Sequence, residues 1–336
     1  MKTTGFGLLL AAFSAAGTLF TTLPALAESK GLVAFSQAEM NNEWRVMDTK
    51  EMEKAWRDAG YDFAWTNANS DPAKQLADVE DLLSRKPAVL IVAPIEYEAL
   101  APVPGLAAKA NIPLIVVDRA LPGKAGANGW ISVLTTDFVD SGIQVANDVV
   151  AQLTKKNGSA KGTVLHVTGN VGASPVIDEQ KGIEQVFAKA PGVKIAASCD
   201  SGNSREGGRK CMEDLLQAFP AGSVDAVIFD NDDAAIGGLA AINAANRTEL
   251  KGWLWGKDGT VDGLKAIVNG DIVMSVQTPP FFGAPSVKAF EDFKAGKKVE
   301  PLSFVPKETF DLHTPGHVER AKKRIEELRA MGVGCC

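Results

Sequence analysis

Residues 113–119 read Pro-Leu-Ile-Val-Val-Asp-Arg, an apolar and largely β-branched run that ends in a carboxylate and a guanidinium. A short run of this kind is typical of a strand that is buried on both faces of a parallel sheet. Ligands of open parallel sheets bind beyond the carboxyl ends of the strands. The run therefore predicts an α/β fold and places Asp118 and Arg119 at a binding edge.

Runs of the same kind recur along the chain and alternate with longer segments of helical period. The early runs are Leu32–Phe35, Tyr61–Trp65, Ala88–Ala93, Pro113–Val117 and Trp130–Leu134, and the later ones are Thr163–Val167, Val193–Ala197, Ala226–Phe229, Gly252–Trp255 and Ile272–Val276. The helical patterns include Glu43–Ala59, Pro72–Ser84, Val139–Thr154 and Asp233–Ala245. Two such sets of strands predict two doubly wound parallel-sheet lobes.

The pattern of elements near the end of the chain indicates how the two lobes are joined. It predicts a hinge of several chain segments and not a single linker. Gly283–Ala295 has the pattern of one more helix and Thr309–Leu312 that of one more short strand. If these elements return to the two lobes in turn, the chain crosses between lobes near residues 135–137, 277–280 and 306–309. We expect an N-terminal lobe of residues 28–135 plus 278–306 and a C-terminal lobe of residues 136–277 plus 307–336. The latter ends in a solvated helix, Pro315–Met331.

The first 27 residues have the pattern of an export signal. A positive start at Lys2 is followed by an apolar run from Phe6 to Phe20 and by small residues at Ala25 and Ala27. The run is short for a membrane span and is interrupted by polar and small residues, which favours a cleaved signal over a retained anchor. We expect cleavage after Ala27 and a mature protein in the periplasm.

Composition and charge narrow the class of partner. The chain has 35 Lys and Arg residues against 41 Asp and Glu residues, and this acidic balance disfavours nucleic acid as the main partner. Hydrophobic residues make up 46% of the chain, which is enough to build a core and excludes a disordered chain. We expect a monomer.

Polar side chains follow most of the apolar runs, where a parallel sheet would bind a ligand. They are Ser36, Gln37, Asn41, Asn42, Asp118, Arg119, Asp137, Asp200, Asp230, Asn231, Asp232, Asp258 and Gln277. Carboxylates, amides and guanidinium groups suit a molecule covered in hydroxyl groups, because each hydroxyl both donates and accepts. Trp44, beside Arg45, is either a core residue of its helix or a platform for a sugar ring, and we favour the platform.

No motif for catalysis, a cofactor or a metal emerges. The chain has no GxGxxG, GxxxxGK[ST] or GxSxG pattern. His166, His313 and His317 have no second ligand at metal spacing. The carboxylates at 230, 232 and 233 fit a helix cap and a sugar ligand better than a metal site. We expect a binding protein without cofactor or metal, not an enzyme.

The four cysteines form two pairs. Cys199 and Cys211 are 12 residues apart, and exported thiols oxidise readily. A disulfide between them stays an open possibility at this stage, because sequence does not give the separation of their Cα atoms. Cys335 and Cys336 are adjacent near the end of the chain, and we have no functional account of them.

Several motifs in order resemble those of the periplasmic sugar-binding proteins of ABC transporters, the ribose-binding-like group. They are Phe35-Ser36-Gln37, Glu43-Trp44-Arg45, Asn69–Gln75, Ile112-Pro113, Val117-Asp118-Arg119, Gly172-Ala173-Ser174, Asn231-Asp232-Asp233, Asp258-Gly259 and Gln277-Thr278-Pro279. The resemblance covers most of the mature chain, and within the group it is strongest to the galactofuranose-binding branch.

This resemblance implies a set of ligand contacts and a partner. Asp118 and Arg119 would grip adjacent sugar hydroxyls, helped by Asn42, Trp44 and Arg45, while Asn231 and Asp258 would close over the ligand and Gln277 would bind at the crossing. The implied partner is the permease of an ABC importer. A sensor that delivers its closed form to a chemoreceptor or a sensor kinase is the alternative.

Two departures from the family pattern alter the predicted pocket. Residues 177–182 read Ile-Asp-Glu-Gln-Lys-Gly, so Glu179 replaces an arginine of the family, and Asn203 stands where ribose binders place an aromatic ring. Because a glutamate is not buried without a partner, we expect Glu179 to pair with Arg45 or another cation, or to accept from ligand hydroxyls. The expected ligand is a neutral monosaccharide, furanose or pyranose, or a polyol.

Overall fold

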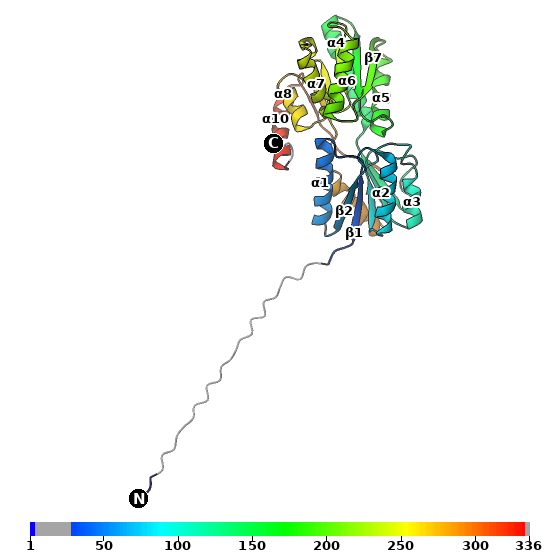
Figure 1. The fold of residues 1–336 in the computed structure, drawn as a ribbon, viewed down its shortest axis with the longest axis vertical. Coiled ribbons are helices and arrows are strands. Elements are labelled where there is room, and N and C mark those ends of the chain that lie inside the picture. Colours follow the sequence, from blue (N-terminus) through cyan, green and yellow to red (C-terminus); the bar gives the residue numbers. More distant parts are fainter. Residues whose placement is uncertain (4–27, 333–336) are drawn as a thin grey trace.

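The computed structural model describes residues 1–3 and 28–332. Within these residues it contains two six-stranded sheets, each flanked by helices, which follow one another along the long axis of the molecule (Figure 1). The predicted fold of two α/β lobes is confirmed. The apolar run of the predicted export signal, and Cys335 and Cys336, lie outside the described residues.

The first sheet has the strand order β11-β5-β4-β3-β1-β2, and all of its strands are parallel. Its strands are β1 Leu32–Gln37, β2 Asp62–Asn67, β3 Val89–Val92, β4 Leu114–Asp118, β5 Trp130–Thr135 and β11 Leu302–Phe304. Its helices are α1 Glu43–Asp58, α2 Pro72–Ser84, α3 Val103–Ala110 and α9 Gly283–Lys294. The order reverses between β1 and β3, which is the switch point at which doubly wound sheets bind ligands.

The second sheet repeats this order as β12-β10-β9-β8-β6-β7, with β12 antiparallel at its edge. Its strands are β6 Lys161–Thr168, β7 Gly192–Asp200, β8 Ala226–Phe229, β9 Leu254–Asp258, β10 Met274–Gln277 and β12 Thr309–Asp311. Its helices are α4 Phe138–Asn157, α5 Ser174–Phe187, α6 Arg205–Ala218, α7 Asp232–Ala244, the 3-10 turn Thr248–Leu250, α8 Val261–Val268 and α10 His317–Ala330.

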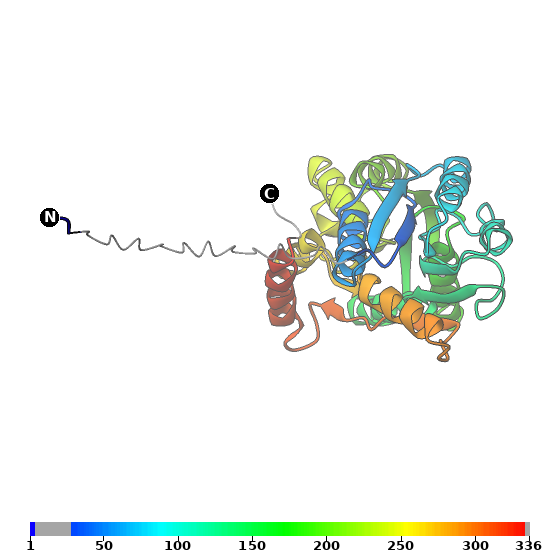
Figure 2. The ribbon, with the colours of Figure 1, turned by 90° about the horizontal axis from the view of Figure 1, so that it is seen from below.

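Alternation along the strands explains why the sheets are covered on both faces. In β4, Ile115 and Val117 pack into the core beneath α1 and α9, whereas Leu114 and Val116 pack into the core beneath α2 and α3. The view from below shows α1 and α9 along one side of the first sheet (Figure 2). The run from which the fold was predicted is therefore apolar throughout because both of its faces are buried.

The chain passes between the sheets at three places, through residues 136–137, 278–282 and 305–308. At these places, and at the carboxyl ends of the strands, polar side chains also cap helices. Asn42 caps α1, Asp137 caps α4 and Asn231 caps α7, each by accepting from a backbone N–H in the first turn. Capping therefore fixes several of the predicted ligand residues at the edge where the lobes meet.

The terminal helix differs from its prediction. One face of α10 is buried through Ala321, Ile325 and Leu328 and packs against α8, so the helix is not solvated all round. Its charged residues form the opposite face. Among the described residues, no helix is both long enough and apolar enough to cross a membrane.

Candidate functional site

A cavity lies between the two lobes and brings together residues from widely separated parts of the chain. It is lined by Glu39, Asn42, Trp44, Arg45, Asp118 and Arg119 from the first lobe, by Phe138, Ala173, Pro175, Val176, Glu179, Asn203, Asp230, Asn231 and Asp258 from the second, and by Thr278. The volume open to the centre of a water molecule is about 60 Å³. A polar space of this size has room for several water molecules and hence for a small ligand.

Two aspartates occupy equivalent places in the two lobes. Asp118 ends β4 and Asp258 ends β9, and both line the cavity. Both have positive φ angles, 61° for Asp118 and 101° for Asp258, which side-chain-bearing residues rarely adopt. Strain of this kind persists where the surrounding structure enforces it and gathers at functional sites. The two strand ends therefore turn their carboxylates from opposite lobes toward one space.

The first lobe contributes a ring of alternating charges. Arg45 Nη2 donates to Asp118 Oδ2 at 2.7 Å, and Arg119 Nη2 donates to Glu39 Oε1 at 2.7 Å. Arg45 Nε lies 3.7 Å from Glu39 Oε1 and links the two pairs. All four side chains are at most 5% exposed. Paired in this way, the arginines are held in position before any ligand arrives.

The second lobe contributes a buried network around Lys257. Its ammonium group pairs with Glu179 and donates to Asp230 Oδ1 at 3.0 Å, while His166 Nε2 lies 2.7 Å from the same oxygen. The cation expected for Glu179 is thus Lys257, not Arg45. Burial raises the pKa of Glu179 to about 8 against the opposing effect of Lys257, whereas Lys257 and His166 hold the pKa of Asp230 below its usual range despite its burial.

Asp258 differs from the other carboxylates of the cavity. Burial, together with the nearby negative charges of Asp232 and Glu179, raises its pKa well above the usual range. Among the hydrogen bonds that join described residues, none reaches its side-chain oxygens, although Asp118, Glu39 and Asp230 all accept from protein donors. Its hydrogen-bonding capacity is therefore directed at the cavity.

Trp44 is both a core residue of the first lobe and a lining residue of the cavity, and its role as a platform for a sugar ring stays a prediction. Its ring lines the cavity, and it also belongs to the core of the first lobe, where it packs against Phe282 at a centroid distance of 6.3 Å. Its Nε1 donates to Thr278 O at 2.6 Å, and the Arg45 guanidinium lies 4.7 Å from the ring centroid. The ring is an apolar wall fixed to one of the crossings between the lobes.

Three predicted ligand residues lie elsewhere and support the site indirectly. Gln37 is wholly buried behind the cavity, where its Oε1 accepts from Arg45 Nη1 and its Nε2 donates to Asp48. Asp137 caps α4. The amide of Gln277, oriented so that both of its atoms are satisfied, accepts from Arg324 Nη2 at 2.8 Å. None of the three is among the residues that line the cavity, and their role as ligand contacts stays a prediction.

Nine of the twelve predicted site residues do line the cavity, together with residues that sequence reasoning missed. Glu39 lies two residues beyond the end of β1, and sequence reasoning passed over it although it selected Asn41 and Asn42 of the same loop. Lys257 does not line the cavity but pairs with Glu179, and a buried lysine inside a strand is unusual enough to serve as a signal. Phe138 and Thr278 lie at the crossings, and only the pairing of the lobes brings them to the ligand space.

The carboxylates that follow β8 separate into different tasks. Asp230 lines the cavity, whereas Asp232 accepts from Thr260 N and Ser275 Oγ in the interior of the second lobe. Asp233 pairs with Arg205 and accepts from Glu43 N of the first lobe at 3.3 Å. The described residues contain no group of three or more side chains arranged to hold a metal ion.

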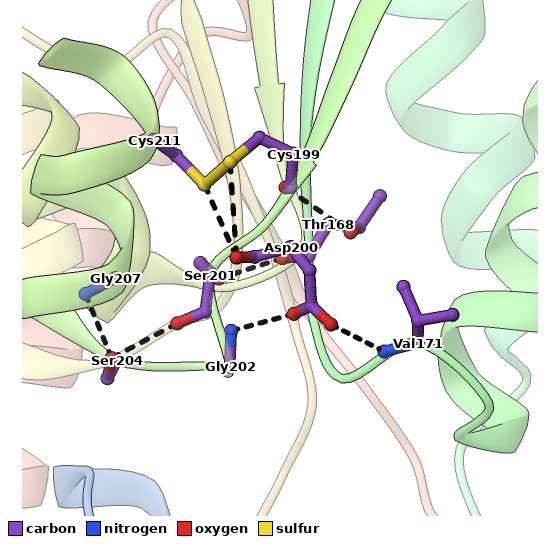
Figure 3. The surroundings of a disulfide bond; sticks show 9 residues. All are labelled: Thr168, Val171, Cys199, Asp200, Ser201, Gly202, Ser204, Gly207 and Cys211. Carbon is purple, nitrogen blue, oxygen red and sulfur yellow. Dashed lines mark hydrogen bonds between the residues drawn. A yellow bond between two sulfur atoms is a disulfide. The ribbon is translucent and has the colours of Figure 1, made fainter. Parts of the chain in front are cut away.

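A disulfide braces the loop that carries Asn203. Cys199 at the end of β7 is bonded to Cys211 in α6, with their Cα atoms 5.7 Å apart (Figure 3). Between them, Asp200 accepts from Gly202 N and Val171 N, and Ser201 Oγ donates to Thr168 O. A side chain at Gly207 would collide with the Ser201 carbonyl, so this glycine allows the loop to pack closely against α6. The disulfide that the sequence left open is present.

Comparisons with known proteins find sugar-binding proteins that are similar to this chain over most of its length. The chain is 31% identical to the ribose import binding protein of Escherichia coli (strain K12) over 292 residues, which cover 87% of this chain and 94% of the relative. It is 26% identical to the galactofuranose-binding protein of the same strain, with 89% and 92% covered. The crystal structure of a galactofuranose binding protein superimposes with a TM-score of 0.81 at 26% identity, covering 90% of this chain and 99% of that one.

The match to a protein family extends over most of the two lobes. The profile of the periplasmic binding protein domain matches residues 33–298, from β1 to the segment after α9. The chain belongs to the periplasmic binding protein domain family.

Proposed function

We propose that this protein captures a neutral monosaccharide or a related polyol between its lobes and delivers it to the permease of an ABC importer. The observation that carries the proposal is the interlobe cavity with Asp118 on one side and Asp258 on the other. A ligand that bridges them has its hydrogen bonds completed only when the lobes are together. Differential contacts of this kind drive hinge closure. The import function of the ribose-binding relative supports the transport role.

The charge pattern favours a neutral ligand over a sugar acid. Arg45, Arg119 and Lys257 are each already matched by a protein carboxylate. Because these three cations are already paired, a ligand carboxylate would be buried beside them without a counter-charge of its own, which is costly. Hydroxyl groups, in contrast, complete the hydrogen bonds of carboxylates and guanidinium groups alike.

The remaining assignments are part of the same proposal. The lobes comprise residues 28–135 plus 278–306 and residues 136–277 plus 307–336, and the chain is exported to the periplasm by a signal cleaved after Ala27. The protein acts as a monomer without catalytic activity of its own. The interlobe position of the cavity supports binding and closure as its task.

Thermal-shift measurements of the purified protein test the ligand class. The panel consists of D-ribose, D-galactose, L-arabinose and myo-inositol, with D-galacturonic acid as the acidic member. At a concentration 100 times Kd, a bound sugar stabilises the folded state by about 2.7 kcal/mol, which is readily measured as a rise in melting temperature. We expect at least one neutral compound to raise the melting temperature.

Matched variants show whether binding takes place in the cavity. Asp118→Ala should abolish or strongly reduce the shift, because it removes the cavity carboxylate and frees Arg45. Asp214→Ala, a change of the same kind at an exposed position of α6, should leave it intact. Stabilisation by D-galacturonic acid alone, or a shift that survives Asp118→Ala, would contradict the proposal.

A further inference from the structure

The two lobes contact one another directly as well as enclosing the cavity. Tyr97 N of the first lobe donates to Gly172 O of the second at 2.9 Å, and Ala120 N donates to Ser174 Oγ at 2.7 Å. Asn41 Nδ2 donates to Gly202 O at 3.2 Å. Each of these contacts involves a backbone atom. Protein groups alone therefore contribute to holding the lobes together.

Glu39 makes a different kind of interlobe contact, from a buried charged side chain. It is 1% exposed, and each of its oxygens accepts from both lobes. Oε2 accepts from Ser70 Oγ of the first lobe at 2.9 Å and from Asn170 Nδ2 of the second at 2.9 Å. Oε1 accepts from Arg119 Nη2 of the first lobe at 2.7 Å and from Asn203 Nδ2 of the second at 3.5 Å.

We infer that Glu39 is a positioning residue that couples closure of the lobes to the placement of the cavity arginines and stabilises the closed form before a sugar binds. When the lobes separate, Asn170 and Asn203 move away with the second lobe, while Arg119 and Ser70 remain with the first. One carboxylate thus orients Arg119 in both states and gains hydrogen bonds only in the closed one.

The ionised state of Glu39 strengthens this role. Burial disfavours the charge, but Arg119, Arg45 and the donors on Asn170 and Ser70 outweigh burial and lower its pKa to about 2. Hydrogen bonds to a charged group are stronger than those between neutral groups. Because the bond to Asn170 exists only in the closed form, it shifts the ligand-free equilibrium toward closure by its net gain over the bonds to water that replace it in the open form.

Two variants separate interlobe coupling from the general environment of Glu39. Asn170→Ala removes a hydrogen bond to Oε2 from the opposite lobe, and Ser70→Gly removes one of equal length to the same oxygen from the same lobe. Glycine is chosen at position 70 because its φ is 62°. Neither residue lines the cavity.

The readouts are small-angle X-ray scattering of the ligand-free protein and sugar dissociation followed by stopped-flow tryptophan fluorescence, with D-ribose and D-galactose as probes. We expect Asn170→Ala to increase the radius of gyration without sugar and to speed dissociation about tenfold, the effect of losing one hydrogen bond to a charged group. Ser70→Gly should leave the radius of gyration unchanged and alter the dissociation rate by less than about twofold. Glu39→Gln should increase the radius of gyration and the dissociation rate more than Asn170→Ala does, because it also weakens the bond from Arg119 to position 39.

The outcomes distinguish this inference from the proposed function. If neither sugar binds the unmodified protein, the choice of sugar fails, and the ligand-free scattering still decides the role of Glu39. Equal scattering curves for Asn170→Ala, Ser70→Gly and the unmodified protein would overturn the inference even if sugar binds. Parallel melting curves exclude a general loss of stability as the cause of any difference.

Discussion

The Asp258 carboxyl is directed at the cavity with its hydrogen-bonding capacity unused by the described protein groups. It is held at a strained φ at the end of β9, lines the cavity and has a raised pKa because it is buried near other carboxylates. A raised pKa favours the protonated carboxyl, a form that both donates and accepts a hydrogen bond. Under the proposed function, two neighbouring sugar hydroxyls would supply both partners.

The effect of substituting Asp258 on sugar affinity should therefore depend on whether the new side chain keeps a hydrogen-bond donor and acceptor. We expect Asp258→Ala to weaken sugar binding by 1 to 3 kcal/mol, about tenfold to a hundredfold in Kd, because partner hydroxyls lose their hydrogen bonds. Asp258→Asn, which keeps one donor and one acceptor, should lose much less. Isothermal titration calorimetry at pH 7 compares them. An Asn variant as weak as the Ala variant would show that Asp258 acts as a charged carboxylate instead.

At the scale of elements, the disulfide between β7 and α6 connects stability to the site. The four residues of the loop 201–204 lie between the bonded cysteines, and Asn203 in this loop accepts from Asn231 Nδ2 at 2.8 Å. The bond thus fixes the approach of α6 to β7 and, through it, the position of a cavity residue. A reduced chain has more freedom in its unfolded state and a less constrained loop in its folded state.

Replacement of both Cys199 and Cys211 by alanine should lower the free energy of unfolding by about 3 kcal/mol, the value expected for closing a loop of this size. Urea denaturation monitored by circular dichroism measures it. The unmodified protein in the presence of a reductant serves as the control and should approach the variant. If neither the variant nor the reduced protein lost stability, the packing of α6 alone would be sufficient to hold this loop, and the prediction would be wrong.

At the scale of the whole molecule, buried carboxyl groups in both lobes determine how stability depends on pH. Burial raises the pKa of Asp48 in the first lobe and of Asp232 in the second from 3.8 to about 7, and that of Glu179 to about 8. At a pH between the ordinary pKa of such a group in the unfolded chain and its raised pKa in the folded protein, the unfolded chain has released a proton that the folded protein still holds. The free energy of unfolding therefore falls as the pH rises from the lower pKa to the higher one. Glu39, whose pKa falls from 4.5 to about 2, acts oppositely at lower pH.

The melting temperature should therefore be highest near about pH 4 to 5 and fall by several degrees by pH 8. Asp232→Asn should flatten this decline, because the amide still accepts from Thr260 N without the charge. Differential scanning calorimetry across the pH range measures both profiles. A melting temperature that rises from pH 5 to pH 8 in the unmodified protein would contradict the assignment of these groups.

Much of the site was predictable because strand ends are local signals. Asp118 and Asp258 each follow an apolar run directly, so their place at the binding edge follows from the geometry of a parallel sheet. Gln37 and Gln277 carry the same signal and still point elsewhere, because the rotation of a side chain at a strand end depends on its neighbours. Arg45 and Arg324 draw these two amides away from the cavity.

The sequence by itself determined the α/β class, the two-lobed architecture and most of the cavity residues, since periodicity and strand ends depend on residues close together in the chain. Only the tertiary structure decided which charges meet. Glu179 pairs with Lys257, 78 positions away, and Glu39 accepts from Asn170, 131 positions away. Such pairs arise from the packing of sheets and lobes, and no local pattern records them, because a charged side chain is equally compatible with several partners until the fold places one within reach.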